Sequence, residues 1–164
     1  MTTRDETADA EIQAILQIRN IALLIDAHTA ATTGDLDHFT AAELLDLDWA
    51  GVDVRSFDPD ADPEAGLDLA ESIRERIEEY PLAVLVRTDW HEVGAEDSGP
   101  TQYQLLLSTG GPATRIVGEL SEHGEAITAD IEHQDWGTPW TRYGITAEVE
   151  GSLVSFAQCF HFGD

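Results

Sequence analysis

The sequence predicts an α+β fold: a small antiparallel sheet of about four to five strands with helices packed on one of its faces. Apolar residues recur at helical spacing in the first half and at the very end, while short strand-like runs separated by turn residues fill most of the second half. The length of 164 residues is near the usual size of one domain, and 42% hydrophobic residues suffice for an ordinary core. We therefore expect a single domain over residues 1–164.

Helices are expected in four segments. Residues 11–27 carry apolar side chains at helical spacing over more than one face, which predicts a largely buried helix. Residues 62–80 open with an aspartate cap followed by proline, and residues 146–160 are capped by Thr146. A shorter helix should follow the capping box at residues 40–43. These segments supply the predicted helical layer.

Strand patterns dominate the second half of the chain. The candidate strands, in chain order, are residues 52–57, 82–88, 102–108, 114–120 and 127–134. The last two flank a short polar turn and predict a hairpin. Residues 91–100 and 137–144 are rich in turn formers, so we expect loops there.

The charge balance is the most informative feature of the composition. There are 33 acidic side chains against 8 basic ones, all of them arginines, which gives a net charge of -25. Such a field repels phosphate, so direct binding to nucleic acid is excluded and basic surfaces are the natural partners. High internal salt, a GC-rich genome and an acidic surface that is itself the function remain open as explanations. No membrane-length apolar run or secretion signal occurs, which predicts a cytoplasmic protein.

A polar glycine turn lies between two predicted strands. The backbone amides of Thr109, Gly110 and Gly111 could cradle an anion, with Asp135 nearby as a further ligand-binding residue. A phosphate loop needs a following helix, whereas a strand is expected here, so a plain turn is the preferred interpretation.

Two tryptophans, Trp136 and Trp140, stand in one loop together with Arg142 and Tyr143. Trp, Tyr and Arg dominate binding hot spots, so this loop is a candidate partner-binding site. The alternative, which the small size of the domain favours, is that both indoles close the end of the core.

A metal site is a weaker possibility. His123, His133 and Asp135, with His91, could supply ligands, but nothing in the spacing fixes a third one. Ordinary surface histidines are the preferred interpretation, and neither a metal nor a cofactor is expected. Cys159 is expected to be a buried thiol, because it lies among the aromatic residues of the last predicted helix.

Part of the chain resembles a known group of proteins. The runs that carry the resemblance are Ser108-Thr109-Gly110-Gly111-Pro112, Arg115-Ile116, Gly118-Glu119-Leu120, Asp135-Trp136-Gly137-Thr138-Pro139-Trp140-Thr141 and Phe160-His161-Phe162-Gly163. They are similar to a group of small proteins encoded by phages, prophages and plasmids. The likeness covers residues 103–163 and implies a mobile-element origin without implying a particular activity.

Two hypotheses about function follow. The first is a non-enzymatic inhibitor of a host defence system, of the anti-CRISPR or anti-restriction kind, that offers carboxylates to a nucleic-acid-binding groove. Its partner-binding residues would be Glu43, Asp46, Asp48, Asp53, Asp58, Asp60, Asp62, Glu64 and Asp68, together with Trp136 and Trp140. The second is a small ligand-binding domain or enzyme from a high-salt or GC-rich host, with its site between the 109–111 turn and the 135–140 loop. We prefer the first, acting as a monomer or dimer.

Overall fold

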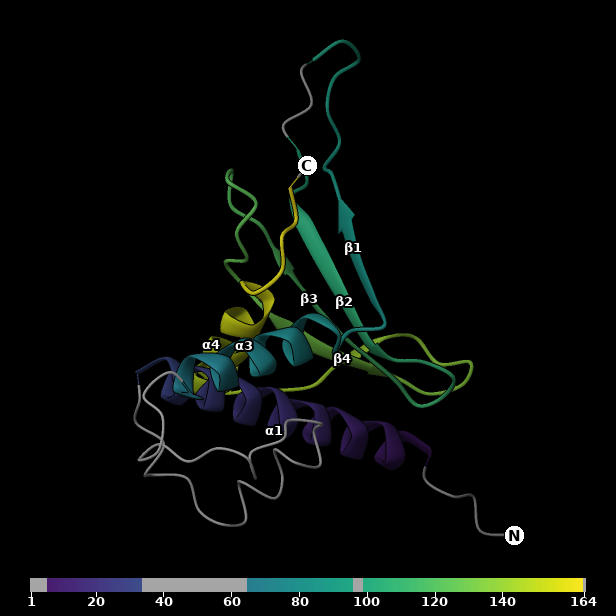
Figure 1. Ribbon diagram of the computed structural model, residues 1–164. Helices are drawn as coiled ribbons and strands as arrows, with labels where there is room; N and C mark the ends of the chain where they lie inside the picture. Colours follow the sequence, from purple (N-terminus) through teal and green to yellow (C-terminus); the bar gives the residue numbers. More distant parts are fainter. Residues whose placement is uncertain (1–5, 34–64, 96–98, 164) are drawn as a thin grey trace, which may run out of the picture.

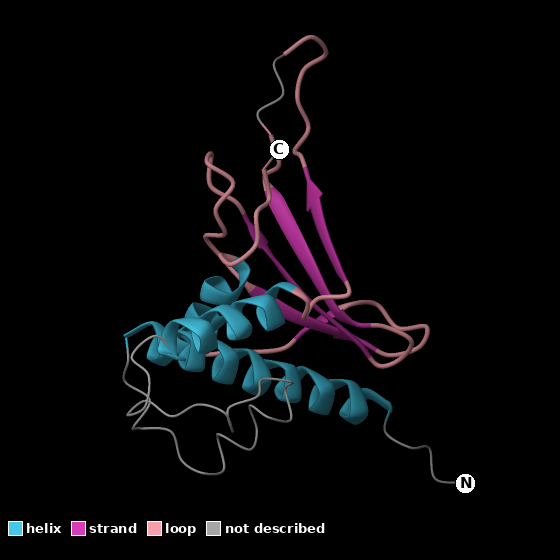
Figure 2. Cartoon of the chain, viewed as in Figure 1, coloured by secondary structure: helices cyan, strands magenta, loops and turns pink. Residues whose placement is uncertain are grey.

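A computed structural model describes residues 6–33, 65–95 and 99–163 and has the predicted α+β architecture (Figures 1 and 2). Its elements are α1 (Glu6–Thr33), α3 (Ala65–Glu78), β1 (Ala83–Arg87), β2 (Gln102–Ser108), β3 (Ala113–Glu119), β4 (Asp130–Gln134), β5 (Thr141–Arg142) and α4 (Ala147–Ala157). The strands form one antiparallel sheet in the order β1-β2-β3-β4-β5. The helix expected after residues 40–43 and the strand expected at residues 52–57 lie outside the described residues.

The three longer predicted helices are confirmed. α1 extends past both predicted ends, because Ala30 and Ala31 continue its buried side and alanine is the best helix former. Residues 62–64 of the second predicted helix lie outside the described part, and α3 covers the rest up to Glu78. No helix in the described ranges is long and apolar enough to cross a membrane.

The four strand predictions that fall on described residues are confirmed, and the hairpin of β3 and β4 is antiparallel. β4 is shorter than expected and begins at Asp130, because the chain after the turn first makes an isolated bridge between Leu120 and Ala126. The expectation of a loop throughout residues 137–144 is wrong. β5 pairs there with β4, yet a strand of two residues has no periodicity that a sequence can reveal.

The core lies between one face of the sheet and the helices. Side chains alternate along β2, β3 and β4, so that every second residue points inward. The largest fully buried apolar side chains are Ile21, Leu24, Ile73, Ile77, Leu105, Ile116, Ile131, Leu153 and Phe156. Burial of each such side chain stabilises the fold by roughly 1.5–3 kcal/mol. Packing therefore holds the sheet and the helices together.

Tyr80 ties the helical layer together where α3 ends. Its hydroxyl donates a hydrogen bond to Oε1 of Gln17 at 2.6 Å, and its ring meets that of Phe156 edge to face at 5.7 Å. Burial raises the pKa of the Tyr80 phenol. One side chain thus contacts α1 and α4 at the point where the chain leaves α3 for β1.

The helical layer does not cover the whole sheet. α1 packs on β3 and β4, whereas β1 projects beyond the helices (Figure 1). None of the described helices α1, α3 and α4 lies on the opposite face of the sheet (Figure 2). β1 is consequently exposed along most of its length, on both of its faces.

A buried hydroxyl on the core face of β3 yields a stability prediction. Thr114 is fully buried, and its Oγ1 has no hydrogen-bond partner. Since an unsatisfied buried polar group costs about 1–3 kcal/mol, Thr114→Val should raise the free energy of unfolding by about 1 kcal/mol in urea titrations. Thr128→Val is the control: Oγ1 of Thr128 accepts a hydrogen bond from the Glu119 amide at 2.9 Å, so this variant should be destabilised. If Thr114→Val is destabilised, the Thr114 hydroxyl does form a stabilising hydrogen bond and this prediction is wrong.

Candidate functional site

Most of the acidic stretch that the sequence predicted as partner-binding cannot be placed. Glu43, Asp46, Asp48, Asp53, Asp58, Asp60, Asp62 and Glu64 lie outside the described residues. Asp68 alone of that set is described, and it is exposed in the first turn of α3. The role of the other eight therefore stays a prediction.

The described structure adds an ordered row of carboxylates on α3, which we call the acidic stripe: Asp68, Glu71, Glu75 and Glu79. These four exposed residues are three or four positions apart, so they share one side of the helix and of the turn that follows it. At a rise of 1.5 Å per residue, four charges span about 16 Å. One strand of duplex DNA carries a charge about every 3.4 Å. The carboxylates of the stripe are therefore about 5.5 Å apart along the axis, a wider spacing than that of one DNA strand, but they form a regular row of like charge.

Of the two arginines of α3, Arg74 pairs with a carboxylate outside the acidic stripe. Nε of Arg74 pairs with Oε1 of Glu78 at 3.0 Å, and the Arg76 guanidinium lies 5.6 Å from the centre of the Tyr80 ring. Glu78 is therefore the carboxylate that Arg74 neutralises. Exposed ion pairs of this kind contribute little to stability, so the helix owes its position to Ile73 and Ile77 in the core.

Acidic residues are unevenly distributed over the fold. Residues 80–88 and 99–118 contain none, although 33 of the 164 residues in the chain are acidic. β1, β2 and β3 as far as Gly118 thus carry no carboxylate, whereas the exposed sides of the helices carry many. Sequence reasoning missed this segregation, and the two acid-free runs were the signal that could have revealed it.

The helix-free face of the sheet holds a compact polar cluster around Arg115. Its guanidinium stacks on Trp140 at 4.2 Å from the ring centre and donates hydrogen bonds to Oε2 of Glu132 at 2.7 Å and to Oε1 of Gln104 at 2.8 Å. Arg142 pairs in the same region with Asp130 at 2.8 Å. Both arginines pair with carboxylates of β4, and Arg87, farther along the same face, hydrogen-bonds to the neutral side chain of Gln102.

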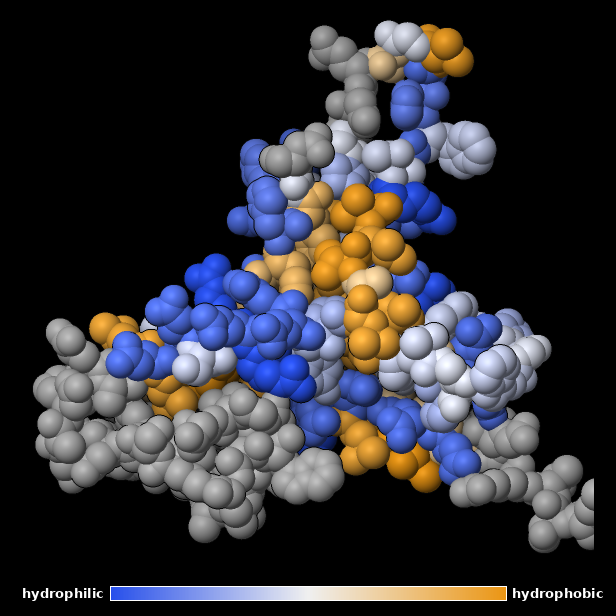
Figure 3. All heavy atoms as spheres, turned by 45° about the vertical axis from the view of Figure 1, so that its right-hand side comes forward, coloured by the Kyte–Doolittle hydropathy of each residue, from blue (hydrophilic) through white to orange (hydrophobic). Residues whose placement is uncertain are grey.

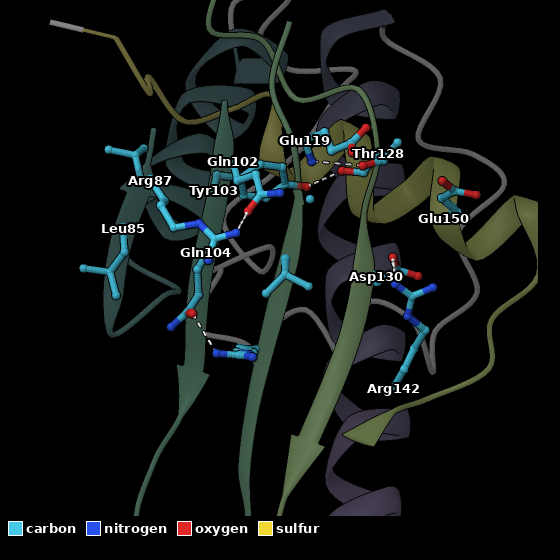
Figure 4. A pocket seen from close by; sticks show the side chains of 14 residues that line it. Leu85, Arg87, Gln102, Tyr103, Gln104, Glu119, Thr128, Asp130, Arg142 and Glu150 are labelled. Carbon is cyan, nitrogen blue, oxygen red and sulfur yellow. Dashed lines mark hydrogen bonds and ion pairs between the residues drawn. The ribbon is translucent and has the colours of Figure 1, made fainter. Parts of the chain in front are cut away.

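A broad hollow of about 910 Å³ is lined by residues of all five strands and by Glu150 of α4 (Figure 4). Arg87, Arg142, Glu119, Asp130 and Glu150 all line it, so its charge is mixed. Arg87 donates a hydrogen bond to Gln102 across the two strands. The lining therefore has no concentration of one charge that would select a small ionic ligand.

Tyr103 is the hydroxyl-bearing aromatic residue of this hollow. The hydroxyl donates a hydrogen bond to the carbonyl oxygen of Thr128 at 2.7 Å. Burial, aided by the negative charges of Asp130 and Glu150, raises the pKa of Tyr103 far above its usual value. The phenol consequently stays protonated at neutral pH, where it cannot act as a general base.

The glycine turn and the tryptophan loop do lie together, as the second hypothesis requires. Gly110 and Gly111 have φ values of 103° and 94°, which side-chain-bearing residues rarely adopt. The Trp136 indole lies directly over Gly111, where a Cβ atom would overlap it. The space proposed for a ligand at this point is therefore filled by the protein's own side chain.

Asp135 has a structural role in this loop. Its Oδ1 accepts a hydrogen bond from the Trp136 amide at 2.7 Å, while its carbonyl accepts one from the Thr138 amide at 3.0 Å. Gly137 supplies the positive φ of 74° that the turn needs. Asp135 and Gly137 are thus accounted for by the geometry of the turn at residues 135–138, and neither needs a ligand-binding role to explain its presence.

The expectation that both tryptophans belong to the core is wrong. Trp136 is 76% exposed, and Trp140 is half-buried beneath Arg115 on the face away from the helices. The core end is closed by other residues, notably Phe156 and Phe162. A partner-binding role for Trp136 and Trp140 remains a prediction.

The residues considered for metal binding do not meet. His133 is buried on the core face of β4, whereas His91 and His123 are exposed in separate loops. Within residues 6–33, 65–95 and 99–163, no group of three or more metal-binding side chains converges. Cys159 is partly buried, and burial raises the pKa of its thiol, so it is a poor nucleophile at neutral pH.

In comparisons with protein family models, with curated proteins and with solved structures, no match was found. The resemblance of residues 103–163 to small phage, prophage and plasmid proteins therefore stays a prediction. What the chain does has to be inferred from its own residues and their geometry.

Alanine substitutions separate the surface tryptophan from the core. Trp136→Ala should lower the free energy of unfolding by less than about 1 kcal/mol, because the exposed indole loses little packing. Phe156→Ala, at a fully buried position, should cost about 3–5 kcal/mol. Chemical denaturation measures the free energy of unfolding of both variants. A decrease of more than about 3 kcal/mol in the Trp136 variant would show that Trp136 is part of the core.

Proposed function

We propose that the protein is a non-enzymatic inhibitor of a host defence nuclease system, of the anti-CRISPR or anti-restriction kind, carried by a mobile element. It would act by presenting carboxylates to a basic groove that normally holds nucleic acid. The observation that carries this proposal is the acidic stripe of α3, an ordered row of carboxylates on one side of a packed helix. A groove built to accept one dense array of negative charge accepts another.

Preorganisation supports this role. α3 is held by Leu69, Ile73 and Ile77, which are buried in the core, so the helix needs no ordering when a partner arrives. Binding then avoids the entropic cost of fixing the carboxylates in a row. A field of net charge -25 would also accelerate encounter with a basic partner at physiological ionic strength.

The competing explanation is that the acidity only keeps the protein hydrated in a high-salt host, while its function is ligand binding or catalysis. Hydration of that kind favours acidic residues on every exposed element. β1 is exposed, yet residues 80–88 contain no acid. The proposed ligand space beside Gly111 is also filled by Trp136. Both observations favour a surface with a dedicated acidic side.

Competition with DNA tests the mimicry directly. The protein should displace a labelled duplex from a purified CRISPR effector or restriction enzyme that it inhibits. Neutralising two charges of the acidic stripe with Glu71→Gln and Glu75→Gln should weaken this displacement about tenfold, equivalent to about 1.4 kcal/mol. The matched control is Glu122→Gln with Glu125→Gln, which removes the same charge from the exposed turn between β3 and β4. Equal losses in both double variants would mean that net charge, rather than the stripe, governs binding.

Salt dependence separates mimicry from adaptation to salt. The screening length falls from about 10 Å at 0.1 M salt to about 3 Å at 1 M, so self-repulsion is strongest in dilute buffer. We expect a melting series in potassium chloride to find the protein folded below about 0.2 M, on the order of cytoplasmic ionic strength. Its affinity for the nuclease should decrease as the salt concentration rises. If the protein instead folds only in molar salt, the acidity is an adaptation of the host.

A further inference from the structure

β1 is an edge strand of the sheet formed by the described residues. Among the described residues β1 pairs with β2 alone, so the backbone N–H and C=O groups on its other side are left without a strand partner. Proteins usually protect such an edge with lysine, proline, a bulge or a covering element. Residues 83–87 contain no lysine and no proline, and their register with β2 is continuous.

The side chains of this edge are apolar and exposed. Val84, Leu85 and Val86 are 43%, 51% and 51% exposed, although they alternate between the two faces of the sheet. They contribute to a continuous hydrophobic strip that crosses the exposed edge (Figure 3). Just beyond the strand, Trp90 and Val93 are fully exposed as well. Exposed hydrophobic patches of this kind mark interaction sites in soluble domains.

The charges around the edge define what can bind there. No acidic residue occurs from Tyr80 to Thr88, but Glu78 and Glu79 precede this run, while Asp89 and Glu92 follow it. The strand itself ends in the cation Arg87, which hydrogen-bonds to Gln102, and Glu78 pairs with Arg74. The acids left beside the apolar residues are therefore Glu79 before the strand and Asp89 and Glu92 after it. The complementary strand has an apolar centre and a basic residue at each end.

A second copy of the chain is a poor partner for this edge. Antiparallel pairing centred on Leu85 would bring the Glu78 and Glu79 end of each copy to the Asp89 and Glu92 end of the other. Acids of both copies would then gather at each end with one Arg87 among them, and two molecules of net charge -25 repel each other. The edge therefore selects a strand from a different, basic protein.

We propose that the outer edge of β1 is a strand-addition site, which receives a β-strand of Val, Ile or Leu residues flanked by Lys or Arg from a basic partner protein. The added strand would hydrogen-bond to the edge of β1 that no described strand occupies, and it would cover Val84 and Val86 on one face and Leu85 on the other. The proposal rests on the proposed function only for the basic character of the partner. Its backbone and apolar contacts lie on β1, and Glu79 is the one residue that it shares with the acidic stripe.

A synthetic peptide tests the site. The probe has a five-residue Val and Ile centre with two lysines at each end, and its control carries a proline at the central position with the same charge. The probe should bind at least ten times more tightly than the proline control, because proline cannot complete the strand hydrogen bonds. Hydrogen exchange should slow at the β1 amides when the probe is bound. Equal affinity of the two peptides, or protection confined to α3, would overturn the proposal.

Matched variants locate the binding on the protein. Leu85→Lys should weaken probe binding at least tenfold, because it places a charge in the apolar strip. Ile127→Lys adds the same charge at an equally exposed apolar position outside β1 and should retain most of the affinity. If the Leu85 variant fails to fold, as judged by its melting temperature, Leu85→Thr replaces it with the same expectation. Equal weakening in the Ile127 variant would overturn the proposal.

The variants also separate this proposal from the proposed function. Probe binding that is lost in the Leu85 variant, while no DNA displacement is detected for the unaltered protein, would leave the strand-addition site standing and remove the mimicry. DNA displacement without any probe binding would support the mimicry and overturn the strand-addition site. A concentration-dependent dimer that Leu85→Lys abolishes would overturn the choice of occupant, because the edge would then serve a second copy.

Discussion

The fold depends on keeping a large surplus of carboxylates in water while a core is built from the remaining residues. With 33 acidic and 8 basic side chains, the chain cannot neutralise its charge internally. A carboxylate that is buried without a partner costs several kcal/mol, so acids are tolerated only where they stay hydrated or meet an arginine. In the described structure many acids lie on the outer sides of the helices. The two acids of β4 form ion pairs, Glu132 with Arg115 and Asp130 with Arg142. The acid-free strands β1 and β2 and most of β3 can then pack closely.

Patterns that arise from burial were readable in the sequence. α1, α3 and α4, together with β2 to β4, each present apolar residues to one core, and their periodicity follows from that contact. Features that depend on contacts between distant segments were not readable. β5 exists because residues 141 and 142 meet β4, and Trp136 is exposed because it lies over Gly111 instead of the core. The cluster around Arg115 likewise combines residues from separate strands with Trp140 of a loop.

The sequence predicted the acidic character of the candidate site better than it predicted which residues form the site. Composition indicated an acidic surface and a basic partner, but it could not indicate which acids an ordered helix would align. Asp68 was among the predicted partner-binding residues, whereas Glu71, Glu75 and Glu79 were not. Their alignment follows from a helical period that is anchored by Ile73 and Ile77. The exposed β1 edge was missed because an apolar run of five residues has the same pattern whether the fold covers it or leaves it bare.

The two surfaces would contribute differently to one complex. The acidic stripe gives long-range attraction that salt weakens, whereas the β1 edge gives short-range backbone hydrogen bonds and apolar contact. Hydrogen exchange measured on the complex with an inhibited nuclease tests this account most directly. It predicts slowed exchange at the amides of α3 and β1, with little change in the turn at residues 109–112 and in the loop at residues 135–140. Protection centred on that turn and loop, with α3 and β1 unchanged, would contradict the account.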